Sequence, residues 1–247
     1  MTKSEILNRI SRGRTDLVFE LLRLAEWPAV LGEGRVRALQ WFVYYNDVTA
    51  MKAVLEAGGD LTSIDLDEEL GNAAFFGHWK MADFLLAHGA SATATNADTG
   101  ETALHNALAK AGRPYFIYVV KLLVEHGADV NASTIPGKET GAFMRDVRTK
   151  GETSLHRAAA YADVDIIGYL LANGADREAR DAHGESPISW ASQHLRPGAV
   201  LSLLSFGEHR ISGTSQCHIT SDHGAGWGNG MDWKLIGEFL PESIEAQ

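Results

Sequence analysis

GETSLHRAAAYADVDIIGYLLANGADREARDAH, residues 151–183, is followed directly by a second start, GESPISWAS, at Gly184. A related stretch, GETALHNALAKAGRPYFIYVVKLLVEHGADVNA, begins earlier, at Gly100. Each copy is 33 residues long, and self-similarity at such a period is the sequence signature of a repeat architecture. In a repeat array each unit buries its apolar face against its neighbours, so these copies define the fold class before any single residue is interpreted.

The same rhythm extends through most of the chain. Each unit has an anchor residue at the leucine of T-x-L-H, then a second apolar pair, then a glycine that accepts the left-handed backbone of a helix end at little steric cost. The anchors are Leu39, Leu70, Leu104, Leu155 and Ile188, and the closing glycines are Gly58, Gly89, Gly127, Gly174 and Gly207. We therefore expect two helices per unit, in repeats at about 36–65, 66–96, 97–132, 148–180 and 181–207.

The segments outside these repeats depart from the pattern. Residues 1–35 keep the two-helix rhythm without the T-x-L-H start, which predicts N-terminal capping helices. Residues 133–150 form an inserted loop between two repeats, and residues 208–247 form a C-terminal extension with a Gly-rich loop and a short helix that seals the array. Within the repeats, Leu66 and Gly71 replace the usual glycine and histidine, and GRPYFIY (112–118) lengthens one turn between helices.

The T-x-L-H start, the paired leucines and the G-A-D close resemble the ankyrin repeat. The resemblance implies an all-α solenoid of stacked helix-turn-helix pairs with β-hairpin tips, and a non-enzymatic scaffold that binds a segment of another protein. An inhibitor, an immunity protein and an effector all remain open as the biological role. Thr102 and Thr153 fall at helix starts, where a hydroxyl can accept from free backbone N–H groups. We expect His105 and His156, at the family's L-H position, to tie neighbouring turns together by hydrogen bonds.

Composition narrows the class of partner. The net charge is -10 and 45% of the residues are apolar, which is typical of a folded protein and does not favour a surface for nucleic acid or anionic membrane. Cys217 is the single cysteine, so an intrachain disulfide is excluded. Charges recur every few residues near the N-terminus, and no stretch approaches the apolar length of a membrane span, so we expect a cytoplasmic monomer without leader, cofactor or metal.

Aromatic residues recur just after the small residues of the first helix in four of the five repeats, and the repeat at 97–132 has Ala109-Lys110 there. In the implied fold these positions line a concave groove, where large rigid rings favour binding of a protein segment. The predicted partner-binding residues there are Tyr44, Tyr45, Phe75, Phe76, Lys110, Tyr161 and His194. The inserted loop adds Phe143, Arg145 and Arg148, in a segment that is locally basic. Two alternatives stay open: the rings turn inward, or the C-terminal extension covers them.

A second functional hypothesis is catalytic. The groove, the loop at 133–150 and the histidine-containing extension would close into a small-molecule pocket, with His194, His209, His223 or Asp222 as acid–base groups. A metal site at Cys217, His218, Asp222 and His223 has awkward spacing, and no nucleophile motif surrounds the cysteine. The interaction module is therefore the favoured interpretation, with no catalytic residue assigned.

Overall fold

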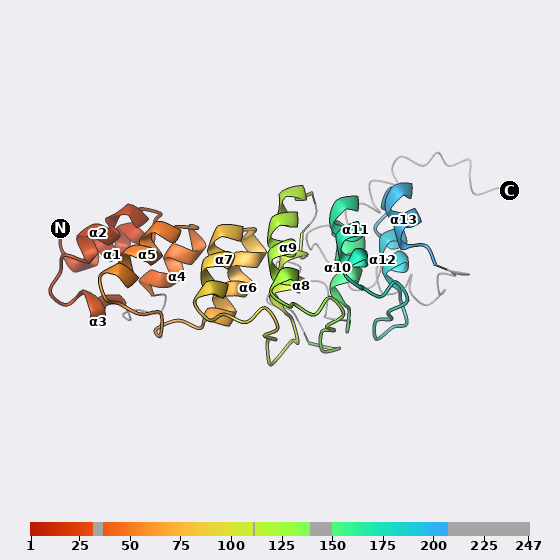
Figure 1. The fold of residues 1–247 in the computed structure, drawn as a ribbon, viewed down its shortest axis with the longest axis horizontal. Helices are drawn as coiled ribbons and strands as arrows, with labels where there is room; N and C mark the ends of the chain where they lie inside the picture. Colours follow the sequence, from red (N-terminus) through yellow and green to blue (C-terminus); the bar gives the residue numbers. More distant parts are fainter. Residues whose placement is uncertain (32–36, 111, 139–149, 207–247) are drawn as a thin grey trace, which may run out of the picture. The chain divides into compact units, whose positions relative to one another are not determined.

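A computed structural model of the chain describes residues 1–31, 37–110, 112–138 and 150–206 (Figure 1). These residues form helices joined by turns and loops, in agreement with the predicted all-α class. They divide into two compact units. The first unit comprises the described parts of residues 1–94, 102–107 and 115–128, and the second comprises those of residues 95–101, 108–114 and 129–247.

The first unit consists of an N-terminal group of helices followed by three helix pairs. Its elements are α1 (Lys3–Ile10), η1 (Thr15–Leu17), α2 (Val18–Leu21), α3 (Trp27–Leu31), α4 (Ala38–Tyr44), α5 (Val48–Glu56), α6 (Leu66–Phe76), α7 (Trp79–Ala87), α8 (Ala103–Ala107) and α9 (Ile117–Glu125). A short 3-10 turn, η2 (Pro114–Phe116), leads into α9.

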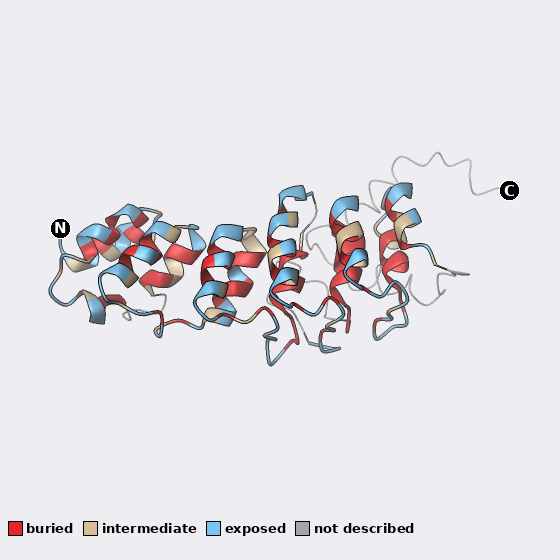
Figure 2. Ribbon diagram, in the orientation of Figure 1, coloured by how far each residue is buried: buried red, intermediate tan, exposed pale blue. Residues whose placement is uncertain are grey.

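Two layers of helices run through the first unit. The leading helices α4, α6 and α8 contact one another in succession, and the following helices α5, α7 and α9 do the same. The N-terminal helices continue both layers, because α1 contacts α4 and α2 contacts α5. The anchor residues Leu39, Leu70 and Leu104 are completely shielded from water, and buried positions lie on the sides where helices face one another (Figure 2). This stacking of helix pairs is the predicted solenoid arrangement.

The second unit repeats the arrangement with α10 (Ser154–Tyr161), α11 (Val164–Ala172), α12 (Pro187–Gln193) and α13 (Gly198–Leu204). The leading helices α10 and α12 contact each other, and so do α11 and α13. In the described part of this unit an isolated antiparallel bridge joins Ser133 to Thr153 at the predicted hairpin tip. None of the helices in the described ranges has the length and apolar character needed to cross a bilayer.

Helix starts and ends follow the residues that the repeat pattern singled out. The Thr153 hydroxyl and the Thr153 backbone N–H lie 2.9 Å and 3.2 Å from Nδ1 of His156, so this nitrogen accepts from the backbone. The other ring nitrogen, Nε2, therefore carries the proton and donates to the carbonyl of Glu185, 3.0 Å away in the next repeat. The predicted role of this histidine, tying neighbouring turns together, is confirmed. Four closing glycines have positive φ, as predicted: Gly58, Gly89, Gly127 and Gly174.

The repeat that lacks the usual glycine and histidine has a longer leading helix. Its helix α6 begins at Leu66, well before the anchor Leu70, because Asp65 caps it by accepting from the N–H groups of Asp67 and Glu68. At Gly71 an added Cβ would lie 2.8 Å from Nδ2 of Asn106. Because residue 71 is a glycine and has no side chain, Asn106 of α8 occupies the space beside it.

Most of the remaining domain predictions concern residues that the structure does not describe. The closing glycine Gly207 and the extension at 208–247, with its sealing helix and its Cys217 and histidine cluster, lie outside the described residues. So does the central part of the inserted loop, residues 139–149. The capping role of residues 1–35 stays a prediction.

Candidate functional site

The C-terminal ends of α4 and α6 bring four predicted binding residues together. The rings of Tyr44 and Tyr45 meet edge-to-face with centroids 4.9 Å apart, and those of Phe75 and Phe76 do the same at 5.1 Å. Tyr44 and Phe76 link the two helices, with centroids 5.2 Å apart and planes at 79°. Such edge-to-face pairs are favourable beyond the area they bury, so the four rings support one another's positions.

Two further rings extend this group. Trp41, one turn before the tyrosines on α4, lies 5.8 Å from the Tyr44 ring, and His78 stacks on Phe76 at 5.5 Å. Burial lowers the pKa of His78, although its hydrogen bond to the Val43 carbonyl opposes this shift. We call Trp41, Tyr44, Tyr45, Phe75, Phe76 and His78 the aromatic cluster. Spacing along α4 could have revealed Trp41, since residues three and four apart share a helix face.

The aromatic cluster is partly open to water. Tyr44 is 48% exposed and Tyr45 is 38% exposed, whereas Phe75 and Phe76 are half-buried. The Tyr45 hydroxyl donates to the carbonyl of Ser11, 3.0 Å away, which fixes this ring against the N-terminal helices. The cluster lies where each leading helix turns into the next helix. The alternative in which the rings turn inward therefore does not apply to Tyr44 and Tyr45, and the groove itself stays a prediction.

In the second unit, Tyr161 is only 8% exposed. It packs with Ala160 and Trp190, and His194 meets its ring edge-to-face with centroids 5.0 Å apart. The expectation that Tyr161 projects into an open groove is therefore wrong. The physical reason is the large Trp190 side chain from the next repeat, which covers the end of α10 and is held by a 3.0 Å hydrogen bond from its indole N–H to Asp181.

The other predicted binding residues are either half-buried in the second unit or lie outside the described residues. His194 is half-buried and stacks on Trp190 as well as contacting Tyr161. Lys110 is half-buried in the second unit, where burial and then the nearby charge of Arg113 lower its pKa. Phe143, Arg145 and Arg148 lie outside the described residues.

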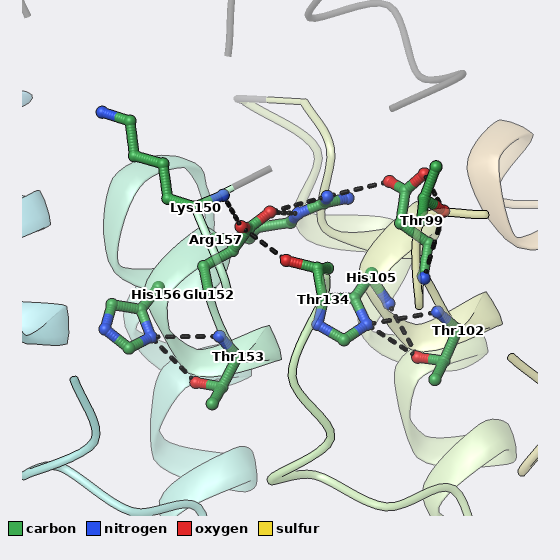
Figure 3. Close-up of polar contacts among 10 residues, drawn as sticks. Thr99, Thr102, His105, Thr134, Lys150, Glu152, Thr153, His156 and Arg157 are labelled. Carbon is green, nitrogen blue, oxygen red and sulfur yellow. Dashed lines mark hydrogen bonds and ion pairs between the residues drawn. The ribbon is translucent and has the colours of Figure 1, made fainter. Parts of the chain in front are cut away.

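A buried ionic cluster in the second unit was not predicted. Nη2 of Arg157 lies 2.8 Å from Oε1 of Glu152 and 2.8 Å from Oε1 of Glu101 (Figure 3). All three side chains are at most 6% exposed. Burial alone would raise the pKa of Glu152, but the charge of Arg157 and hydrogen bonds from Thr134 and Arg157 outweigh it and lower the pKa to about 2. The signal in the sequence was the glutamate that recurs after the glycine in GET and GES.

This ionic cluster fastens both ends of the inserted loop. At the first end, Thr134 donates from its hydroxyl to Glu152 Oε2 at 2.8 Å, and its N–H donates to the Glu152 carbonyl at 3.0 Å. At the other end, the N–H of Lys150 donates to the same Oε2 at 2.7 Å. The backbone N–H of Ile135 also donates to the Thr99 carbonyl. The loop therefore leaves the repeats from a base held by one buried carboxylate.

Comparison with known proteins places these repeats in a family. A model of three ankyrin repeats matches residues 39–134, and a model of a single ankyrin repeat matches residues 150–182, together more than half of the chain. The human protein Rabankyrin-5 is 35% identical over 42% of this chain and 8% of its own length. The human Neurogenic locus notch homolog protein 2 is 32% identical over 65% of this chain and 7% of its own length.

A yeast protein, Palmitoyltransferase AKR1 of Lachancea kluyveri, is 26% identical over 69% of this chain and 26% of its own length. The chain thus spans about a quarter or less of each of these relatives. The helix pairs, the threonine–histidine caps and the family matches agree, and the chain belongs to the ankyrin-repeat family.

Proposed function

We propose that this chain is a non-enzymatic interaction module that binds a segment of another protein through the aromatic cluster. Ankyrin repeats generally mediate protein–protein interactions, and the family is generally non-enzymatic. The observation that carries the proposal is the joining of Tyr44, Tyr45, Phe75 and Phe76 into one partly exposed group across α4 and α6.

The physical chemistry of the aromatic cluster suits a binding surface. Each ring offers a large apolar area, and aromatic side chains lose little rotamer entropy when a partner immobilises them. The edge-to-face contacts already restrict the rings, so part of the ordering cost precedes binding. The exposed Tyr44 also supplies a hydroxyl for a hydrogen bond to the partner. A segment with one or two apolar side chains matches this surface.

Affinity purification with a paired set of variants tests the proposal. The tagged wild-type chain and a Tyr44→Ala/Phe76→Ala variant are used to capture proteins from cells of the source organism, followed by quantitative mass spectrometry. Phe19→Ala is the matched control, because Phe19 is 52% exposed on α2 and does not belong to the aromatic cluster. Circular dichroism first checks that each variant keeps its helices.

The expected result is that one or more partners are lost with the double variant and kept with Phe19→Ala. Truncation of aromatic residues at the centre of an interface commonly costs about 2 kcal/mol or more each, so the loss should be nearly complete. An identical set of captured proteins from all three chains would contradict the proposal.

The finer parts of the sequence-based hypothesis remain proposals. We propose His194 and Lys110 as further contact residues in the second unit, and Phe143, Arg145 and Arg148 of the inserted loop as others. A role as inhibitor, immunity protein or effector, a monomeric state and a cytoplasmic location are equally part of the proposal.

A further inference from the structure

A second group of exposed aromatic residues lies on the following helices of the first unit. Trp79 at the start of α7 is 44% exposed, and Tyr118 on α9 is 60% exposed. Their ring centroids are 6.3 Å apart, so the two rings form one surface where α7 contacts α9. Tyr115, 54% exposed, lies one turn before Tyr118. Exposed apolar groups of this size on a folded domain usually mark an interaction surface.

Both tyrosines belong to the lengthened segment GRPYFIY, residues 112–118. Phe116, in the middle of that segment, is only 2% exposed and lies against the turn between α6 and α7. A Cβ at Gly77 would fall 2.6 Å from the Phe116 ring, so the ring occupies space that only glycine leaves open. With Phe116 buried, its neighbours Tyr115 and Tyr118 face water, and the Tyr118 ring lies beside Trp79.

Each of the two aromatic side chains Trp79 and Tyr118 has a lysine near it in sequence. Lys80 follows Trp79, and its Nζ lies 5.5 Å from the centroid of the Trp79 ring. Lys121 comes one turn after Tyr118 on α9, and both residues are exposed. The acidic residues of this face, Asp83 and Glu125, come about one turn later on their helices. Lys80 and Lys121 therefore balance the two carboxylates of this face, whereas the whole chain has a net charge of -10.

We propose that Trp79, Lys80, Tyr115, Tyr118 and Lys121, the α7–α9 patch, bind a protein segment that carries carboxylates next to an apolar side chain. The rings would receive the apolar side chain, and the two lysines would meet the carboxylates by charge complementarity. The patch is built from following helices, whereas the aromatic cluster is built from leading helices. The inference therefore does not depend on the proposed function.

Selection from a library of random peptides displayed on phage, with the full-length chain as bait, tests this assignment. The selected peptides are synthesised, and their affinities for the wild type and for three variants are measured by fluorescence anisotropy. Trp79→Ala/Tyr118→Ala removes the apolar anchors, and Lys80→Glu/Lys121→Glu reverses the charge. Tyr44→Ala/Phe76→Ala alters only the aromatic cluster and is the matched control.

We expect the selection to enrich peptides with Asp or Glu next to Leu, Phe or Trp. Each of the first two variants should weaken their binding by about tenfold or more, while the control variant binds as the wild type does. Binding should also weaken as salt is added, because exposed charges are screened.

Three results would overturn the assignment: no enrichment, enrichment of basic or purely apolar peptides, or binding that survives Trp79→Ala/Tyr118→Ala. Loss of binding in the control variant alone would move the peptide site to the aromatic cluster. That outcome supports the proposed function and rejects this one. Sedimentation with phosphatidylserine vesicles covers a lipid surface, and vesicle binding through Trp79 and Lys80 without peptide binding would also reject the protein segment.

Discussion

Arg157 and Glu152 form a buried ion pair in which the guanidinium gives two hydrogen bonds, from Nε at 3.0 Å and Nη2 at 2.8 Å, to the same carboxylate oxygen. Burying charges is costly, and such a pair is tolerated only when the remaining polar atoms are also satisfied. Here the second oxygen of Glu152 accepts from Thr134 and from the Lys150 N–H, and Glu101 supplies the second negative charge. The pair therefore stabilises the repeat start and the loop base together.

Removing the guanidinium should be strongly destabilising. In Arg157→Met, Glu101 and Glu152 stay buried without their shared cation, and breaking a buried pair in this way typically costs about 3–5 kcal/mol. Urea unfolding followed by circular dichroism measures the loss. The matched control is Arg14→Ala, which breaks the Arg14–Asp16 pair whose side chains are 58% and 60% exposed, and little change is expected there. Equal effects of the two variants would contradict the role assigned to the ionic cluster.

Thr134→Val should have an effect that depends on pH. The variant keeps the shape of the buried side chain but removes its hydrogen bond to Glu152, so at pH 7 it should cost about 1.5–3 kcal/mol, as for bonds to charged groups. Because the pKa of Glu152 is about 2 in the folded chain and higher in the unfolded chain, the stabilisation by its charged form is present above the unfolded pKa. It is lost as the pH falls from about 5 to about 2.

The difference in unfolding free energy between wild type and Thr134→Val should therefore decrease as the pH falls from about 5 to about 2. Urea titrations at a series of pH values measure this difference. Thr62→Val is the control, because Thr62 donates to the exposed carboxylate of Asp60. A difference that stays constant from pH 7 to pH 3 would show that Glu152 does not carry the effect.

Local pattern predicted the backbone of the repeats better than the direction of their side chains. The threonine–histidine caps and the closing glycines depend on residues close together in sequence, and the predictions are confirmed for the cap at Thr153 and for the four closing glycines that the structure describes. The burial of Tyr161 depends on Trp190 of the following repeat, which lies beyond the local pattern. Tyr44 and Phe76 were each predicted as groove residues, but their mutual contact was not predicted and is apparent only in the structure.

The ionic cluster could not be recognised one residue at a time. Glu101, Glu152 and Arg157 are of residue types that usually lie at the protein surface, because charged residues are rarely buried unless paired. Their burial follows from the meeting of two repeat starts at the base of the inserted loop. The repeated glutamate of GET was visible, but its buried partner is apparent only in three dimensions.

The packing at Gly71 predicts that substitutions at Gly71 and Asn106 have coupled effects on the free energy of unfolding. Alanine is favoured over glycine inside a helix by about 1 kcal/mol, but here its Cβ would approach Asn106 Nδ2 to 2.8 Å. Gly71→Ala should therefore stabilise the chain by about 1 kcal/mol when Asn106→Ala has removed the obstacle, and by less, or not at all, in the wild-type background. A double-mutant cycle on unfolding free energies measures this coupling. The same gain in both backgrounds would mean that Asn106 moves aside without cost.

Gly77 should be the less replaceable of two helix-closing glycines. Both Gly77 and Gly58 have positive φ, +72° and +86°, so alanine at either position should cost about 1–2 kcal/mol through backbone strain. Only at Gly77 does the new Cβ meet the buried Phe116 ring, at 2.6 Å, whereas nothing lies within 4 Å at Gly58. Displacing a packed ring adds about 1–3 kcal/mol, so Gly77→Ala should be clearly the less stable variant in urea unfolding.

The same substitution should also act on the α7–α9 patch, because the buried Phe116 belongs to the segment that places Tyr118 beside Trp79. Gly77→Ala should weaken binding of the selected acidic peptides under conditions where both variants remain folded, and Gly58→Ala should not. If the two alanine variants unfold at the same urea concentration and bind equally well, then the Phe116–Gly77 contact does not position this surface.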